Sequence, residues 1–566
     1  MTIIPAPVRQ TVQARFNDGC AYEGPLGTTV EEFVQAAALS GNGRIVAVLV
    51  NGQLRELSHR LYQDATLTPL TTTDSDGVRI FRRSLSFLMI VAAAEVFPGH
   101  TITIHHSLPF GGYYCERDDH RPLTDAELAQ LRGRMRELVA ADLPINQVKE
   151  PLEEALKIFR ASGDLEKVEL FMKRRKDYLT LYELNSVRDY FHGFMVPRTG
   201  YLDLFDLRHY ADGFILQFPR RHDPGRLQPF EDEPTLARVF HDYNDWLDII
   251  GVPSVAALNR AIQQGRTQEI ILVAEAMHDR QLSQIAAEIA GRRPVLKLVF
   301  ISGPTSAGKT TFSKRLAVQL MTQGIYPVAI GMDNYFLNRE DTPRDENGEY
   351  DFERLEALDV ALFQKHLHKL LNGETITQPV FDFRSGRRRE GGPLSIGPNH
   401  VLVVEGIHGL NPRLVEGLPP EAIYRIFISA FTQLNLDRHN RVPTTDTRLL
   451  RRIVRDHAHR GYSAADTIRR WESVRRGEKR HIFPYQNNAD VFFNSALVYE
   501  LSALKPLAQS LLLQVEPGTA ERVEANRLLA FLQWFDPVPP DSIPSDSILR
   551  EFLGGSIMDK FEPWQR

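Results

Sequence analysis

Eight residues with the spacing G-x-x-x-x-G-K-[ST] carry the clearest chemical pattern in this chain, Gly303-Pro-Thr-Ser-Ala-Gly308-Lys309-Thr310. They follow an apolar run, Val295–Ile301, and precede a helix-like segment, Thr311–Leu320. Backbone N–H groups of such a loop cradle phosphate oxygens, and the following helix adds its dipole. The spacing predicts a nucleoside triphosphate site, with a glycine-rich turn in an unrelated α/β protein as the alternative.

Within this loop, the side chains of Lys309 and Thr310 have separate expected tasks. Lys309 would reach the β- and γ-phosphates, and the Thr310 hydroxyl would ligate Mg²⁺. The residues expected to bind the nucleotide are Gly303, Pro304, Thr305, Ser306, Ala307, Gly308, Lys309, Thr310 and Thr311.

Two carboxylates follow later apolar runs. Asp333 comes directly after Val328–Met332, where it could accept the proton of an attacking hydroxyl group. The alternative for the Asp333-Asn334 pair is a simple turn. Glu405 ends the run Val401–Val404, and an acidic residue at such a strand end binds Mg²⁺ directly or through water.

A cationic segment between residues 446 and 461 contains Arg448, Arg452 and Arg455 at positions i, i+4 and i+7. One helix face would carry all three guanidinium groups, which repel each other unless anions meet them. The segment is therefore expected to form a lid that neutralises the transferring phosphoryl group. The alternative is a solvated basic helix with Asp446 and Asp456 as partners.

Composition sets the wider frame. The chain has 566 residues, more than one hydrophobic core holds, and a net charge of −5 gives no general attraction to nucleic acid or membrane. Its two cysteines, Cys20 and Cys115, cannot build a disulfide framework or a thiolate zinc site. The N-terminus lacks signal-peptide features, and the most apolar run, Leu85–Ala94, is too short for a bilayer. We expect a cytoplasmic protein with no membrane partner.

The periodicity of apolar residues predicts the helices and strands that make up the rest of the chain. Alternation at Val12, Ala14 and Phe16 indicates a strand in a β-grasp-like unit over residues 9–72, with Thr28 as the expected helix N-cap and Asn51-Gly52 as a hairpin turn. A helix over Arg83–Glu95, a strand over Thr101–His106 and a helix opened by Thr124 should follow. Residues 233–290 are expected to be helical, with breaks at Pro253 and Gly265.

The region of about 294–500 resembles the phosphoribulokinase/uridine kinase family. The motifs are the phosphate loop, Asp333-Asn-Tyr-Phe336, Tyr350–Asp359, Pro379–Phe383, Val404-Glu-Gly-Ile407, the arginine helix and Tyr485–Asp490. The resemblance implies ATP- or GTP-dependent and Mg²⁺-dependent phosphorylation of a hydroxyl on a ribose-like substrate. It makes Asp333 the catalytic base and Glu405 a Mg²⁺ ligand, and it gives Lys309, Arg455 and Arg460 catalytic roles at the phosphates.

The substrate-reading positions depart from the family pattern. Glu353 replaces an aspartate that holds the ribose hydroxyls, and Phe381 and Gly386 stand where uridine kinases have Tyr and His. Tyr462 and Arg470 replace an arginine and a glutamine. We expect Glu353, Phe381 and Arg452 to line the acceptor side. Arg384 and Arg387–Arg389 could meet an anionic substrate, or they form a solvated basic loop.

The front half has a resemblance of its own. Residues 9–72 resemble a TGS domain, and 76–221 are similar to the second additional domain of threonyl-tRNA synthetase, through Arg83–Phe87 and Gly111–Glu116. Arg83 and Phe87 replace the histidines of the His-Ser-x-x-His editing motif, and the later Cys-x-x-x-His ligands fall near Phe191 and Met195. We therefore expect neither zinc nor editing chemistry here, and we expect His105-His106 to be strand or loop histidines.

Together these patterns predict a multidomain α+β and α/β protein. The expected parts are a TGS-like β-grasp domain (1–75), a synthetase-editing-like α+β domain (76–222), a helical linker (223–292), a parallel-sheet P-loop NTPase kinase domain (293–515) and a C-terminal helical tail (516–566). The expected activity is transfer of the ATP γ-phosphoryl group to a nucleoside or related sugar.

Two further possibilities stay open at this stage. The first is an NTP-driven regulatory or RNA-binding protein with little kinase activity and the TGS-like unit as its sensor. RNA could be the acceptor or a ligand and meet the front half through Lys173-Arg-Arg-Lys176, although such a run is more often a solvated helix face. RNA binding there should weaken steeply with salt. The second is that the chain assembles into a homo-oligomer, which is compatible with either function.

Overall fold

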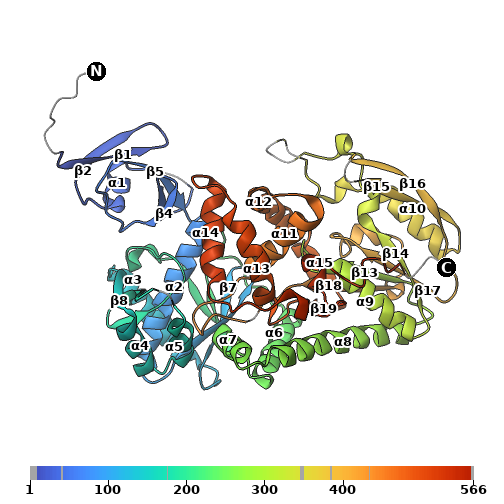
Figure 1. Cartoon of the computed structure of the whole chain (residues 1–566), viewed down its shortest axis with the longest axis horizontal. Coiled ribbons are helices and arrows are strands. Elements are labelled where there is room, and N and C mark those ends of the chain that lie inside the picture. The colour runs from blue at the N-terminus through green and yellow to red at the C-terminus, as the bar shows by residue number, and fades with distance from the viewer. Residues whose placement is uncertain are drawn as a thin grey trace.

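A computed structural model describes residues 9–39, 42–174, 176–344, 348, 350–382, 385–432 and 434–562. The molecule is elongated, with the first sheet at one end and the sheet that carries the glycine loop at the other (Figure 1). Arg384 and Arg175, which belong to two of the basic runs noted above, lie outside the described residues. No helix of the described part is both long and apolar enough to cross a membrane.

The first unit is a five-stranded sheet with one helix, as the alternation predicts. Strand order is β2-β1-β5-β3-β4, with β1 and β5 parallel and the other pairs antiparallel. Val12, Ala14 and Phe16 are buried in its core. The elements are β1 Thr11–Phe16, β2 Ala21–Pro25, α1 Val30–Ala36, β3 Ile45–Val50, β4 Gln53–Glu56 and β5 Ala65–Thr71. This is the expected β-grasp arrangement.

The N-cap of α1 is Thr29, and the expectation of Thr28 was wrong by one residue. Thr29 forms a capping box with Glu32: its Oγ1 accepts from Glu32 N at 3.3 Å, and Glu32 Oε2 accepts from Thr29 N at 2.7 Å. Thr28 instead donates its hydroxyl to the Pro25 carbonyl oxygen at 2.8 Å. Two adjacent threonines precede two glutamates, so composition alone left the register of the cap open.

Replacing Thr29 with alanine should therefore destabilise α1 by about 1 kcal/mol, because the Glu32 amide loses its acceptor. Amide hydrogen exchange of residues 30–36, measured by mass spectrometry, would report the change. The Thr28→Ala variant is the control, since its hydroxyl caps no helix. Equal protection of α1 in the two variants would contradict the assignment of the cap.

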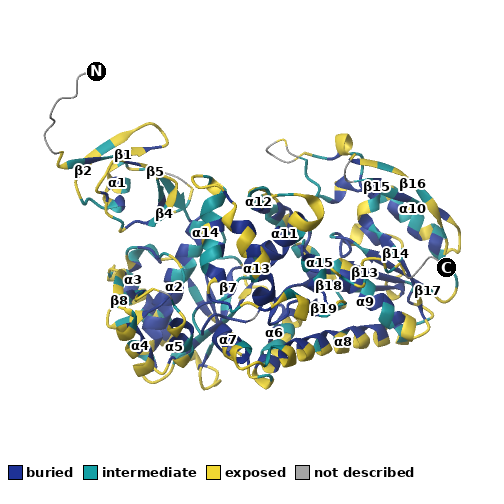
Figure 2. Ribbon diagram, viewed as in Figure 1, coloured by how far each residue is buried: buried dark blue, intermediate teal, exposed yellow. Residues whose placement is uncertain are grey.

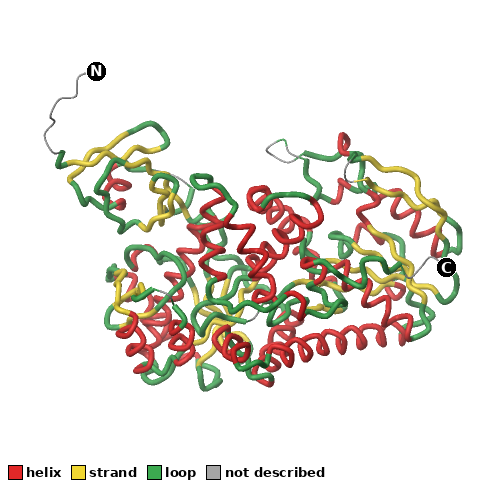
Figure 3. Tube along the Cα trace, in the orientation of Figure 1, coloured by secondary structure: helices red, strands yellow, loops and turns green. Residues whose placement is uncertain are grey.

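The second region packs two sheets against α2 (Ser75–Val96). One sheet has the order β11-β12-β7-β6 and the other β10-β9-β8. Figure 3 shows the strands of this region in yellow among red helices. The helix begins eight residues before the expected Arg83, because Gly77, Val78 and Ile80 in its first turns are also buried. The other elements are β6 Ile102–Leu108, β7 Gly112–Arg117, α3 Asp125–Ala140, β8 Asn146–Pro151, α4 Leu152–Ala161, α5 Leu165–Met172, β9 Tyr178–Leu184, β10 Val187–Asp189, β11 Asp206–Tyr210 and β12 Gly213–Gln217.

Three helices then lead to the second half, and the breaks between them fall at the predicted residues. They are α6 Pro234–Ile249, α7 Val255–Gln263 and α8 Thr267–Gly291. Pro253 and Gly265 lie in the two intervening loops. Along α8, buried and exposed residues alternate, as they should on a helix that packs by one face (Figure 2).

The sheet that carries the glycine loop is parallel throughout, in the order β14-β17-β13-β18-β19. Its strands are β13 Leu298–Ser302, β14 Tyr326–Gly331, β17 His400–Glu405, β18 Ile423–Ser429 and β19 Val491–Asn494. The remaining elements are α9 Lys309–Thr322, α10 Val360–Leu371, hairpin strands β15 Ile376–Asp382 and β16 Arg387–Leu394, α11 Thr444–Arg460, α12 Ala464–His481, α13 Glu500–Leu513, α14 Ala520–Leu532 and α15 Arg550–Leu553. Because parallel strands end at one edge, the polar residues after β13, β14 and β17 come together there.

The C-terminal segment is part of this core. Ile548, Leu549 and Phe552 are fully buried and belong to the same hydrophobic cluster as Phe312 of α9. Lys314 of α9 donates to the Met558 carbonyl oxygen at 2.6 Å. The segment therefore packs against the helix that follows the glycine loop.

The loop between β18 and α11 joins the two halves. Ile104 N of β6 donates to the Arg438 carbonyl oxygen at 2.9 Å, and Asn435 Nδ2 donates to the Ile104 carbonyl oxygen at 2.9 Å. His439 Nδ1 lies 2.6 Å from Asp189 Oδ2. The loop thus hydrogen-bonds to β6 before the chain enters α11.

Candidate active site

The glycine loop connects β13 to α9 in the conformation expected for a phosphate cradle. A side chain at Gly303 would place its Cβ 2.0 Å from the Ile428 carbonyl oxygen, so only glycine fits there. Lys309 Nζ donates to the carbonyl oxygens of Gly303 at 3.0 Å and Pro304 at 3.1 Å. The ammonium group therefore lies over the loop and contacts its backbone.

Thr310 and Glu405 meet at the edge of the sheet. Thr310 Oγ1 donates to Glu405 Oε1 at 3.1 Å, because Glu405 ends β17 directly beside Ile301 of β13. Burial raises the pKa of Glu405 to about 7, and the charge of Lys309 opposes that rise. A hydroxyl and a carboxylate side by side are the hard oxygen ligands that Mg²⁺ prefers, so the residues present fit this ion.

Asp333 lies at the start of a short 3-10 helix after β14, on the same edge. Its side chain is accessible to solvent, but the walls of the site desolvate the carboxyl group and raise its pKa. Lys309 and Arg460 act in the opposite direction and favour the carboxylate. Arg455 also lies close enough to lower the pKa of Lys309. The four residues predicted to be catalytic thus share one electrostatic environment.

The first part of the arginine helix does not serve the predicted lid role. Arg448 is only 2% exposed, donates from Nε to the Thr305 carbonyl oxygen at 3.0 Å and forms an ion pair with Glu478. It is held inside the protein because α11 packs against the glycine loop over its N-terminal half. The helical spacing predicts that Arg448 shares a face with Arg452 and Arg455, but it does not predict that Arg448 is buried.

Over the second part of α11, the arginines share a carboxylate partner on their own helix, as the solvated-helix alternative expects. Arg452 and Arg455 donate to Asp456 at 3.1 and 2.8 Å, and Arg460 Nη1 lies 3.7 Å from the same residue. Asp456 was named as a partner in the solvated-helix alternative. The other partner named there, Asp446, pairs with Arg527 at 2.6 Å.

On the acceptor side, Glu353 faces α12 and the P-loop. Its pKa is raised to about 7 by burial and by the charge of Glu478, against Arg452. Gly477 allows this approach, since a Cβ there would lie 2.4 Å from the Glu353 Cβ. Phe381 is 6% exposed and packs on Phe336, with ring centroids 5.6 Å apart.

Other substituted positions have structural partners. Arg470 lies over the Tyr462 ring at 4.4 Å, so the two departures from the family pattern contact each other. Arg388 pairs with Asp359 at 3.0 Å and Arg387 with Glu340 at 3.3 Å. These two arginines therefore already have carboxylate partners.

Three residues that contact the loop had no sequence signal. Arg451 Nη1 donates to the Ser306 carbonyl oxygen at 3.4 Å, and the same side chain pairs with Glu500. Glu478 Oε1 accepts from Thr305 N at 2.9 Å. Glu551 Oε2 accepts from Thr311 N at 3.2 Å, at the N-terminus of α9 where a phosphate would bind.

Ile548 accompanies Glu551 at this place. A Cβ on Gly308 would lie 2.5 Å from Ile548 Cγ2, so the tail contacts the loop closely. Glu551 also raises the pKa of Lys309 and that of Glu405, which shows its charge acting within the site. The contact between Thr311 and Glu551 joins residues 240 positions apart in the sequence, and no sequence motif predicts it.

In the front half, three of the positions where the synthetase motif has ligands are buried, and the fourth, Arg83, is half-buried. The Phe87 and Phe191 rings lie 5.3 Å apart, Met195 is 1% exposed, and Arg83 Nη1 donates to the Phe194 carbonyl oxygen at 2.5 Å. His105 pairs with Glu116, while the His106 ring stacks on Phe240 at 3.9 Å.

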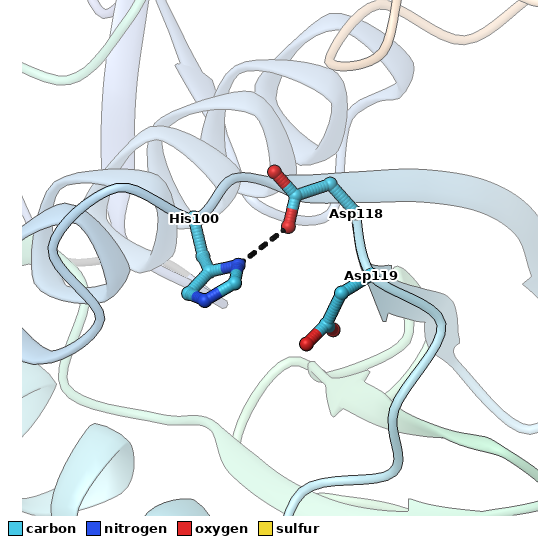
Figure 4. Close-up of side chains that lie close together, drawn as sticks. All are labelled: His100, Asp118 and Asp119. Atoms are coloured by element: carbon cyan, nitrogen blue, oxygen red, sulfur yellow. Dashed lines mark hydrogen bonds and ion pairs between the residues drawn. The ribbon is translucent and has the colours of Figure 1, made fainter.

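Among the described residues, one group of His and acidic side chains is close enough to hold a metal ion: His100, Asp118 and Asp119 (Figure 4). His100 Nδ1 lies 2.9 Å from Asp118 Oδ1. Asp119 accepts two hydrogen bonds from Arg117, at 2.7 and 2.6 Å. Both carboxylates of this group therefore already have cationic or imidazole partners within the protein.

The parallel sheet, glycine loop and converging carboxylates define the C-terminal half as a P-loop kinase. Residues 298–502 match the family model described as "Phosphoribulokinase / Uridine kinase family". The C-terminal region is therefore a domain of this family, and the expected multidomain α+β and α/β fold is confirmed.

Curated relatives match the front half. The threonine–tRNA ligase of Methylococcus capsulatus is 34% identical over 185 residues, which are 32% of this chain and 29% of that protein. The threonine–tRNA ligase of Marinobacter nauticus is 35% identical over 179 residues, 31% of this chain and 27% of that protein. The chain thus spans less than a third of these relatives.

Two solved structures align with the chain at low overall similarity. A putative fructose transport system kinase from Silicibacter sp. TM1040 is 20% identical, with 38% of this chain and 98% of that chain covered and a TM-score of 0.26. A possible uridine kinase from Bacillus stearothermophilus is 18% identical, with 27% and 79% covered and a TM-score of 0.23.

Proposed function

We propose that the C-terminal region transfers the γ-phosphoryl group of ATP to a hydroxyl of a nucleoside or related ribose-containing molecule. The observation that carries this proposal is the convergence of Asp333 with Lys309, Arg455 and Arg460 beside the glycine loop. A carboxylate so placed is what a transfer to an acceptor hydroxyl requires, whereas a hydrolytic switch needs no base beside an acceptor site.

In the proposed reaction, Asp333 accepts the proton of the acceptor hydroxyl as its oxygen bonds to the γ-phosphorus. The bond from that phosphorus to the β,γ-bridging oxygen breaks, and ADP leaves. Lys309, Arg455 and Arg460 offset the negative charge of the phosphoryl oxygens. Thr310 and Glu405 would hold Mg²⁺, which neutralises phosphate charge when bound.

The acceptor is tested by measuring ATP consumption over a panel of nucleosides, sugars and sugar phosphates. The full chain is the right sample, because Ile548 and Phe552 of the tail complete the core around the loop. We expect rapid turnover with one acceptor class and only slow hydrolysis without it. Equal, slow ATP consumption across the whole panel would count against a kinase and favour the second candidate.

That second candidate is an NTP-dependent regulatory protein, favoured by the Glu551 carboxylate at the phosphate position. The likeness of the front half to threonine–tRNA ligases adds RNA as a candidate ligand for that half. A cytoplasmic location, where ATP and RNA are both available, belongs to either proposal, and a homo-oligomer is compatible with both.

A further inference from the structure

Five basic side chains gather where α12 contacts the front half, and we call them the basic cluster. Arg82 comes from α2, Arg220 and Arg221 follow β12, and Arg475 and Lys479 lie one turn apart on α12. All five are partly buried. An ion pair at 2.5 Å between Arg221 and Glu472 of α12 fixes the contact, and Ser75 hydrogen-bonds to both of these residues.

The basic cluster carries more positive charge than the carboxylates beside it, Glu231, Glu472 and Glu478, can offset. In the described part of the chain, the side chains of Arg475 and Lys479 form no hydrogen bond or ion pair. Burial lowers the pKa of Arg475, although the charges of Glu472 and Glu478 raise it. Arg82 lies over the Phe218 ring at 4.6 Å, and its Nε is buried without a hydrogen-bond partner. For Arg220, the surrounding charge that favours its cationic form comes from Glu231 alone.

This arrangement is unfavourable for the empty protein. Burial, Arg475, Arg220, Arg221 and Arg82 together lower the pKa of Lys479 to about 7. An excess of partly buried like charges destabilises a fold, and groups with pKa values perturbed in this way cluster at functional sites. An anion placed among them would remove the repulsion and pair the free donors at once.

We propose that the basic cluster binds a small molecule carrying several phosphate groups. Guanidinium groups bind phosphate oxygens in a bidentate manner, and four of the five cluster residues are arginines. The cluster is partly buried between α12, α2 and the end of β12, rather than spread along an open face as a binding surface for a nucleic acid backbone would be. This inference stands whether or not the region is a kinase.

The cluster is also well placed to act on the P-loop. Glu478, the residue before Lys479 on α12, accepts the hydrogen bond of Thr305 N in the loop. A ligand that binds Arg475 and Lys479 therefore contacts α12, the helix whose Glu478 hydrogen-bonds to the glycine loop. The two halves of the chain would meet at a site to which each contributes basic residues.

Titration calorimetry with inorganic tripolyphosphate tests the proposal on the full chain. Because the P-loop also binds phosphates, Lys309→Ala serves as the parent protein. We expect this parent to bind one tripolyphosphate, and Lys309→Ala/Lys479→Gln to bind it about tenfold more weakly, since a charge-assisted contact is lost. Lys309→Ala/Lys365→Gln, which removes an exposed lysine of α10, should match the parent.

Thermal unfolding separates loss of the site from loss of the fold. The Lys479 substitution removes a repelled charge, so its unfolding midpoint should equal or exceed that of the parent. Equal tripolyphosphate affinity in the parent and in the Lys479 variant would overturn the proposal. Binding of a short single-stranded RNA that needs Lys479, without binding of tripolyphosphate, would overturn it in favour of a nucleic acid ligand.

Discussion

The Asp333→Asn variant is expected to lose phosphoryl transfer by about 10³-fold while binding ATP with nearly unchanged affinity. The amide keeps the size and shape of the side chain, but it has neither the charge nor the basicity to accept the proton of the acceptor hydroxyl. Lys309 and the loop backbone, which hold the phosphates, are untouched. Transfer would be followed by acceptor-dependent ADP release, and nucleotide binding by calorimetry.

The matched control is Asp341→Asn, an exposed carboxylate eight residues further along the same segment. It should retain the parental transfer rate and the parental ATP affinity. Parental transfer by Asp333→Asn would show that the base is elsewhere. A large loss of ATP affinity in that variant would show that Asp333 serves nucleotide binding instead.

The Glu551→Gln variant is expected to bind ATP more tightly, by roughly thirtyfold. Glu551 accepts the hydrogen bond of Thr311 N at 3.2 Å, so its charge lies where the first turn of α9 would receive a phosphate. Two like charges 4 Å apart repel by about 4 kcal/mol at the effective dielectric of a protein surface. We take half of this, about 2 kcal/mol, because the side chain can turn away when ATP enters.

Equilibrium titration with ATP and Mg²⁺ would measure the Glu551 effect. Glu516→Gln, on the exposed loop between α13 and α14, is the control for a lost negative charge in the same segment and should leave the affinity unchanged. If Glu551→Gln binds ATP no more tightly than the parent, the carboxylate does not compete with phosphate. Weaker binding would instead assign Glu551 a supporting role in the nucleotide site.

The sequence allowed the donor side of the site to be predicted because its parts lie at strand ends. A parallel sheet brings the residues after β13, β14 and β17 to one edge, so Lys309, Asp333 and Glu405 could be grouped from hydrophobic runs alone. The β-grasp unit could be predicted equally well, since the alternation of apolar and polar residues over β1 fixes which side chains face the core.

The burial of individual side chains and the contacts between distant segments could not be predicted in this way. The helical period gives the face on which Arg448 lies, but only the packing of α11 on the loop shows that this residue is buried and paired with Glu478. The contact between Glu551 and Thr311 joins two segments with no shared pattern. Such contacts depend on tertiary packing, which local sequence does not encode.

The loop that carries Arg438 and Asn435 has one more consequence. Since it hydrogen-bonds to β6 shortly before α11 begins, the arginine helix is attached at its N-terminal end to a sheet of the front half. Any swing of Arg455 and Arg460 over a bound nucleotide must therefore pivot about this attachment. The front half thus limits how far the helix that carries these two arginines can move.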